Sequence, residues 1–140
     1  MMRALNTAGT GMVAQQMNLD VIANNFKRLK KALPLAEIYY AVKANPAPEV
    51  LNLLAEMGSS FDCASVVEIE QVLATGATSD RISFGNTIKK EKDIARALQY
   101  GVRLFAVDCE AEVEKIARQA AAIGARDVKV FSRFLQDCEG

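Results

Sequence analysis

Apolar and polar positions alternate in two different rhythms along most of this chain. From residue 37 onward, short runs of apolar and β-branched residues recur at intervals of 21 to 24 residues. Amphipathic runs lie between them, in which apolar residues return every three or four positions, as on a helix. The strand-like runs are 38–42, 61–64, 82–84, 104–107 and 128–135. This alternation predicts consecutive βα units whose strands are parallel.

The amphipathic runs carry the signs of helix ends. Ser65 and Glu68 have the spacing of a capping box, and Asp108 is placed to cap the helix that follows it. Glycines that suit a left-handed helix end follow the runs: Gly58, Gly76, Gly101 and Gly124. The last helix is expected to bury one stripe: Val113, Ile116, Ala117 and Ala120.

Parallel βα units build either an open doubly wound sheet or a (β/α)8 barrel. No GxGxxG motif follows the first strand, which disfavours the dinucleotide-binding form of the open sheet. About five strands fit into the chain, whereas a closed barrel needs eight. The expected fold class is therefore α/β, an incomplete parallel (β/α) TIM-type barrel of about five βα units. A preceding N-terminal helix is expected over Leu19–Leu33, ending near Pro34.

Composition and charge exclude several function classes. The 140 residues carry 17 basic and 17 acidic side chains, so we expect no nucleic-acid partner. No apolar run is long enough to span a membrane. The sequence has no histidine, and its three cysteines form no CxxC pair. These absences argue against a metal site, a disulfide scaffold and a Ser-His-Asp nucleophile, and they favour a reducing cytoplasm.

The residues around the first predicted strand carry a more specific signal. Tyr39–Pro46 reads YYAVKANP, which resembles the lysine motif of the fold-type III pyridoxal-phosphate (PLP) enzymes. That group holds the ornithine, lysine, arginine and diaminopimelate decarboxylases. Four further blocks follow in the family's order: SSFDCAS (59–65), RISFGNTIKK (81–90), VRLFAVDCEAE (102–112) and VFSRFLQDCEG (130–140). The resemblance covers residues 19–140 and is strongest to bacterial ornithine/lysine-type decarboxylases, above the alanine racemases.

The resemblance implies an activity, a cofactor and site residues. By this resemblance, Lys43 is expected to be the catalytic lysine, whose amine forms a Schiff base with PLP. Asp62, Glu68 and Arg133 match family positions around the cofactor. PLP acts as an electron sink for decarboxylation of a small amino-acid substrate, in polyamine or lysine metabolism. From the residues alone, Glu68 as a helix cap and Asp62 as a turn or cap residue stay open.

Other features limit what the chain is expected to do alone. The family's stacking histidine, glycine-rich phosphate loop and C-terminal β domain are not found in these 140 residues. We therefore expect an N-terminal barrel fragment that does not decarboxylate by itself. An unpaired edge strand near Val130, or the N-terminal helix, is expected to support a homo-oligomer. Exposed lysines are expected to compete with Lys43 for the PLP aldehyde: Lys27, Lys30, Lys31, Lys89 and Lys90.

The first 25 residues follow another pattern. They read MMRALNTAGTGMVAQQMNLDVIANN, which resembles the N-terminus of the flagellar basal-body distal rod protein. The two resemblances overlap at Leu19–Asn25, so we interpret the chain as a fusion of a rod-like extension, 1–18, and a partial PLP-binding barrel, 19–140. An apolar stripe runs through this join as far as Leu29 and Leu33. The alternatives to an enzyme are a structural rod protein of the basal body and an inactive chimeric scaffold.

Overall fold

The computed structural model describes residues 18–134 of the chain. Its helices are α1 (Leu19–Ala32), α2 (Pro48–Glu56), α3 (Val66–Ala74), α4 (Glu91–Gln99) and α5 (Glu110–Ile123). Its strands are β1 (Tyr39–Ala41), β2 (Ser60–Cys63), β3 (Ile82–Phe84), β4 (Leu104–Val107) and β5 (Lys129–Ser132). Two short 3-10 helices complete it, η1 (Val42–Ala44) and η2 (Ser79–Arg81).

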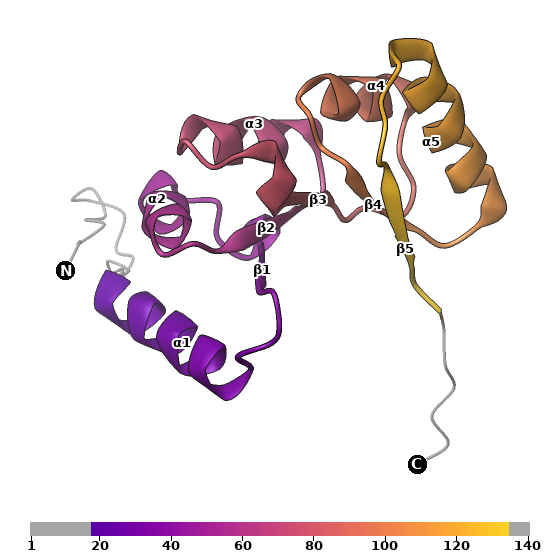
Figure 1. Cartoon of the computed structure of the whole chain (residues 1–140). Helices are drawn as coiled ribbons and strands as arrows, with labels where there is room; N and C mark the ends of the chain where they lie inside the picture. Colours follow the sequence, from indigo (N-terminus) through magenta and orange to yellow (C-terminus); the bar gives the residue numbers. More distant parts are fainter. Residues whose placement is uncertain (1–17, 135–140) are drawn as a thin grey trace, which may run out of the picture.

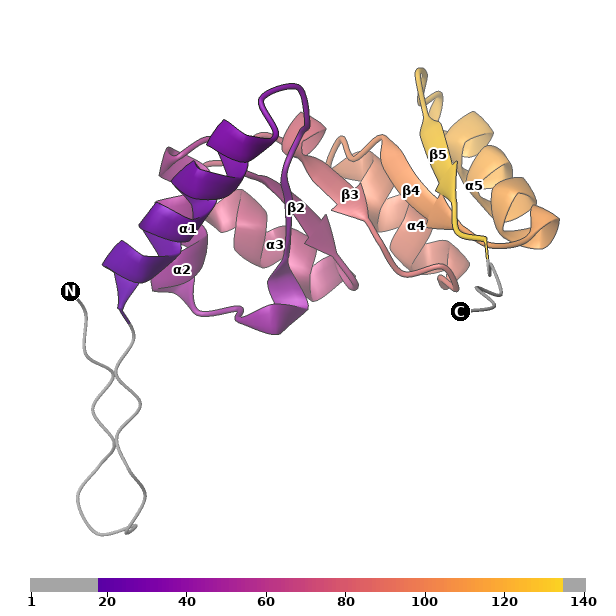
Figure 2. The same ribbon diagram turned by 90° about the horizontal axis from the view of Figure 1, so that it is seen from below.

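The five strands form one parallel sheet in the order β1-β2-β3-β4-β5, so each strand pairs with its neighbour in sequence. Helices α2 to α5 lie along one side of this sheet, and α1 lies beside α2 at the β1 end (Figure 1). The view from below shows β2, β3, β4 and β5 fanned out in sequence order (Figure 2), and β1 and β5 are the two edge strands of the sheet. The predicted run of parallel βα units is confirmed.

The core lies between the sheet and helices α2 to α5. Phe61 of β2 and Phe105 of β4 are fully buried, and they meet Leu51 of α2 and Leu98 of α4 in one apolar cluster. Removing a leucine or phenylalanine side chain from water stabilises a fold by about 1.5–3 kcal/mol. The core side chains of each strand alternate with residues that face away from the helices, which leaves that second face for a site.

The predicted buried stripe of α5 is partly wrong. Ile116 and Ala120 are buried as expected, whereas Val113 is 38% exposed and Ala117 is exposed. The side chain that turns inward in the first turn is Glu112, which is only 4% exposed. Its carboxylate forms ion pairs with two lysines, and these contacts set the rotation of the helix more strongly than a half-buried valine does.

The N-terminal helix begins and ends close to the predicted positions. Asn18 caps α1, because its side-chain oxygen accepts hydrogen bonds from the amides of Asp20 (3.0 Å) and Val21 (3.3 Å). Phe26 is the buried residue of this helix. The apolar stripe is shorter than expected, since Leu29 and Leu33 are 45% and 50% exposed. The rod-like residues before Asn18 lie outside the described part.

The other predicted helix ends can also be compared with the structure. The four glycines at the helix ends all have positive φ, between 68° and 93°. The Ser65 half of the capping box is present, with the Glu68 amide donating to Ser65 Oγ at 3.2 Å, while the Glu68 carboxylate accepts from Ala64, one residue before the N-cap. The predicted cap by Asp108 is wrong, because the N-cap of α5 is Cys109 and makes no side-chain cap bond.

Within residues 18–134, every helix is too short or too polar to cross a membrane.

Candidate active site

A hollow of about 410 Å³ lies on the face of the sheet that points away from the helices. Three residues of its lining are in register across neighbouring strands, because Ala41 pairs with Asp62 and Asp62 pairs with Ser83. The full lining is Tyr39, Ala41, Asp62, Ser83, Leu104, Phe131 and Arg133. This mixture of an apolar floor and a few polar groups is typical of small-molecule sites.

Asp62 is held in place on β2 by its two neighbours. The Ser83 hydroxyl of β3 donates a hydrogen bond to Asp62 Oδ1 at 2.6 Å, and Ser83 is only 2% exposed. The same carboxylate lies directly against Gly85, where a Cβ would come within 2.1 Å of Oδ1. A fixed carboxylate that borders the hollow can accept a hydrogen bond from a ligand without first losing side-chain freedom.

Arg133 borders the same hollow from the other end of the sheet. It directly follows β5, and its amide donates to the Val107 carbonyl of β4 at 3.0 Å. This bond continues the β4–β5 ladder by one step and fixes the backbone beneath an exposed guanidinium. Asp62 and Arg133, which the sequence named as cofactor residues, are thus brought to one hollow with opposite charges.

Lys43 sits in η1 at the carboxyl end of β1, the end at which barrel enzymes place their active sites. Its side chain is exposed. The turn that carries it is fixed on both sides: the Tyr40 hydroxyl donates to the Asn45 carbonyl at 3.2 Å, and Asn45 Oδ1 accepts from the Ala47 amide at 3.1 Å. Lys43 is two residues from Ala41 of the hollow, although it is not among the described residues that line it.

Glu68 has a clear structural task. Its Oε2 accepts a hydrogen bond from the Ala64 amide at 2.6 Å, while Ser65 caps the Glu68 amide in return. The capping alternative for Glu68 is therefore confirmed. Glu68 is not among the described residues that line the hollow, and its role toward a cofactor stays a prediction.

Comparison with known protein families shows which family the chain belongs to. Residues 19–139 match the family model described as pyridoxal-dependent decarboxylase, pyridoxal binding domain. The chain belongs to the pyridoxal-dependent decarboxylases.

Individual relatives share a long segment with this chain. The chloroplastic ornithine decarboxylase of Nicotiana glauca is 47% identical over 102 residues, which cover 73% of this chain and 24% of the relative. The lysine/ornithine decarboxylase of Selenomonas ruminantium is 37% identical over 113 residues, or 81% of this chain and 28% of the relative. Antizyme inhibitor 2 of Xenopus laevis is 40% identical over 99 residues, or 71% and 22%. The chain spans about a quarter of the length of these curated relatives.

Solved decarboxylase structures confirm the fold class. The lysine decarboxylase of Selenomonas ruminantium, in a complex with PLP and cadaverine, superposes with a TM-score of 0.77 at 33% identity. The match covers 86% of this chain and 30% of that one. The lysine/ornithine decarboxylase of Vibrio vulnificus with cadaverine gives a TM-score of 0.76 at 34% identity, covering 87% and 32%. The predicted α/β fold, a partial TIM-type barrel with a preceding helix, is confirmed.

The residues of the hollow fit the cofactor of this decarboxylase family. PLP has a flat ring, an aldehyde and an anionic phosphate, and the hollow offers an apolar floor, a carboxylate and a cation. The small side chains of Ala41 and Ser83 leave the floor open beneath the strand ends. Burial raises the pKa of the Tyr39 hydroxyl, and the Glu37 carboxylate adds to this effect. The exposed Lys43 supplies an amine just beyond the carboxyl end of β1.

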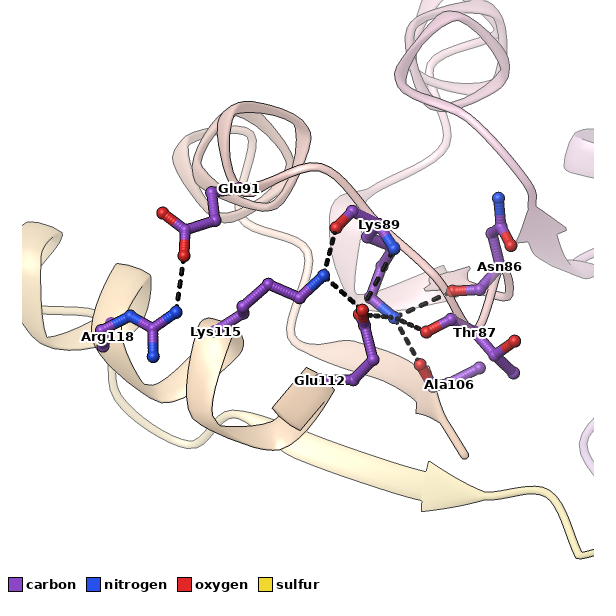
Figure 3. A network of polar contacts seen from close by, with 8 residues as sticks. All are labelled: Asn86, Thr87, Lys89, Glu91, Ala106, Glu112, Lys115 and Arg118. Atoms are coloured by element: carbon purple, nitrogen blue, oxygen red, sulfur yellow. Dashed lines mark hydrogen bonds and ion pairs between the residues drawn. The ribbon is translucent and has the colours of Figure 1, made fainter. Parts of the chain in front are cut away.

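One residue of the hollow and one residue of the β3–α4 loop were missed or misjudged from the sequence. Ser83 was missed, although a polar residue between Ile82 and Phe84 in a buried strand is a usable signal. The expectation that Lys89 is exposed is wrong, because Lys89 is 4% exposed and its ammonium lies among backbone carbonyls (Figure 3). No local pattern distinguishes Lys89 from the exposed Lys90 beside it.

Proposed function

We propose that this domain binds PLP in the hollow between Asp62 and Arg133 and serves an ornithine/lysine-type amino-acid decarboxylase. The observation that carries the proposal is that Asp62 and Arg133, which have opposite charges, line the same hollow. The lysine motif places Lys43 just beyond the carboxyl end of the adjacent strand β1. PLP, when bound, supplies an electron sink for the carbanion left by loss of CO2.

Each residue has a task in this proposal. Lys43 holds the cofactor through its side-chain amine, and its exposed position gives the aldehyde access. Arg133 supplies a permanent positive charge on a fixed backbone. Asp62, oriented by the Ser83 hydroxyl, supplies a hydrogen-bond acceptor. The Ala64 amide occupies Oε2 of Glu68. We therefore assign the other carboxylate oxygen, Oε1, to a contact with the cofactor.

The substrate class follows from the relatives. Solved neighbours were crystallised with putrescine and with cadaverine, which are diamines. Amino acids that carry a terminal amine, such as ornithine and lysine, give these diamines on loss of CO2. We therefore propose a diamino acid as the substrate of the whole enzyme, and we expect this domain alone to release no CO2 from either amino acid above the rate of free PLP.

A non-catalytic role is the second candidate. It is favoured by the similarity to antizyme inhibitor 2 of Xenopus laevis, a relative whose name denotes an inhibitor. The rod-like interpretation of residues 1–25, the fusion, the cytoplasmic location and the homo-oligomer all stay predictions. Binding of PLP separates the first candidate from the second.

Reductive trapping tests the proposed function. The chain is incubated with PLP near neutral pH, reduced with borohydride, and mapped by peptide mass spectrometry. Modification is expected to concentrate on Lys43, and Lys43→Ala is expected to abolish most of it. Lys90→Ala is the matched control, since Lys90 is exposed and is the last residue of the β3–α4 loop.

The pattern of labelling decides the outcome. Equal modification of Lys43 and of the α1 lysines Lys27, Lys30 and Lys31 would show that the hollow gives no selectivity, and the proposal would be wrong. An Asp62→Asn variant adds a second measure, because a site that uses this carboxylate should lose part of the selectivity for Lys43.

A further inference from the structure

The loop between β3 and α4, residues 85–90, is held from inside by a lysine. The Lys89 side chain has no exposed surface. Its Nζ donates hydrogen bonds to the carbonyls of Asn86 at 2.8 Å, Thr87 at 3.1 Å and Ala106 at 2.5 Å (Figure 3). An ammonium group has three N–H donors, so these three carbonyls use all of them. Two of the carbonyls belong to the loop itself, and the third belongs to β4.

Glu112 completes the attachment from α5. Its Oε2 lies 3.5 Å from Lys89 Nζ and also accepts from the Lys89 amide at 3.3 Å. Lys115 forms an ion pair with the other carboxylate oxygen and donates to the Lys89 carbonyl at 2.7 Å. The amide, the carbonyl and the ammonium of Lys89 are thus all in use, and they join the loop, β4 and α5.

Burying this network of charged side chains costs desolvation free energy that an apolar core would not cost. Burial lowers the pKa of Lys89, and the Glu112 carboxylate opposes this shift by stabilising the charged form. Two apolar side chains of similar volume could occupy the same space without losing the hydration of two charges. What apolar side chains cannot do is fix three carbonyl groups at set distances from one atom.

The backbone groups that Lys89 holds are next in sequence to the backbone that contacts Asp62 and Arg133, the two charged residues of the hollow. Gly85 begins the held loop, and the Asp62 carboxylate packs against it. Ala106 directly precedes Val107, whose carbonyl accepts the amide of Arg133. Lys89 therefore connects the backbone that supports Asp62 with the backbone that supports Arg133.

We infer that Lys89 is a positioning residue, which sets the separation of Asp62 and Arg133 by tying the 85–90 loop to the end of β4. This inference rests on the proposed function where PLP binding is the readout. Two hydrogen-bonded amides report on it without PLP: the Gly85 amide, bonded to the Cys63 carbonyl at 2.8 Å, and the Arg133 amide, bonded to Val107 at 3.0 Å.

The decisive variant replaces the buried pair together, as K89M/E112L. Removing Glu112 alone would leave the buried Lys89 ammonium without its counter-charge and would destabilise the domain for a reason unrelated to positioning. The double variant keeps an apolar core, and Lys115 is 22% exposed and can turn to solvent. K90M is the matched control, because it removes the neighbouring exposed lysine.

Hydrogen exchange and PLP titration are measured on the wild type, K89M/E112L and K90M. The double variant is expected to stay folded with a lower unfolding temperature, because three backbone carbonyls lose their donor. It is expected to exchange the Gly85 and Arg133 amides at least tenfold faster and to bind PLP about tenfold more weakly. K90M is expected to match the wild type.

The outcomes separate the two hypotheses. Wild-type exchange rates in a folded K89M/E112L variant would overturn the inference, whether or not PLP binds. Faster exchange in a chain whose wild type shows no PLP binding would support the role of Lys89 and count against the proposed function. Faster exchange with unchanged PLP affinity would overturn the link from Lys89 to the cofactor.

Discussion

Gly85→Ala tests whether the Asp62 carboxylate is pinned where the structure places it. An alanine Cβ at this position would lie 2.1 Å from Oδ1, 2.4 Å from Oδ2 and 2.5 Å from Cγ of Asp62. All three distances are far inside van der Waals contact, so the carboxylate must swing away. The φ angle of Gly85 lies outside the left-handed region, so the backbone itself accepts alanine. The cost of the substitution therefore comes from Asp62.

The magnitude follows from the hydrogen bond that is lost. When the carboxylate moves, the buried Ser83 hydroxyl loses its acceptor at 2.6 Å. A hydrogen bond to a charged group contributes about 1.5–3 kcal/mol to stability, and a buried donor without a partner adds to the loss. We expect Gly85→Ala to lower the free energy of unfolding by about 2 kcal/mol.

The assay is denaturant unfolding of a double-mutant cycle with Asp62→Ala. In the Asp62→Ala background the clashing atoms are absent, so Gly85→Ala should cost less than about 0.5 kcal/mol. The expected coupling between the two sites is therefore about 2 kcal/mol, well above the scatter for independent residues. Additive effects of the two substitutions would show that Asp62 does not lie against Gly85 and would refute the geometry of the site.

Two further predictions concern the rest of the fold. Burial raises the pKa of the Cys63 thiol from its ordinary value of about 9, with the Glu68 and Asp62 carboxylates adding to the effect. Stability from this thiol is therefore complete below pH 9 and falls above it by up to about 1.4 kcal/mol per pH unit, as the unfolded chain ionises. In pH-dependent unfolding, Cys63→Ala should remove this part of the slope; a slope equal to that of the wild type would contradict the prediction. Asn18→Ala should cost about 1 kcal/mol by removing the cap of α1. The exposed Asn24 within the same helix is its matched control, and equal losses from Asn18→Ala and Asn24→Ala in thermal unfolding would rule out a capping role.

Much of the fold could be predicted because it depends on local signals. The strand period, the helical period and the glycines at helix ends each act over a few residues, and they located all five strands closely. The errors lie where a distant partner decides. The rotation of α5 follows the burial of Glu112 rather than Val113, and Glu112 is drawn inward by Lys89, which is 23 residues away in sequence.

The candidate site could be predicted in part for the same reason. The lysine motif and the family blocks named Lys43, Asp62 and Arg133 without any geometry. That Asp62 and Arg133 share a hollow is a property of the strand register. Whether Lys89 or Lys90 is buried depends on which of the two side chains reaches the backbone carbonyl of the neighbouring strand β4. The sequence pattern alone does not contain that information.

The sequential order of the sheet has a consequence for the route by which the chain folds. Every strand pairs with the strand before it, so each pairing closes a loop of roughly twenty residues and no strand waits for a distant partner. Such pairings have a shorter sequence separation than pairings between the two ends of a chain, which favours faster folding than in topologies that depend on those. During synthesis, each βα unit can therefore dock on the previous one as soon as it leaves the ribosome. The Asp62–Ser83 contact between β2 and β3 would then form while the residues of β5 were still being translated.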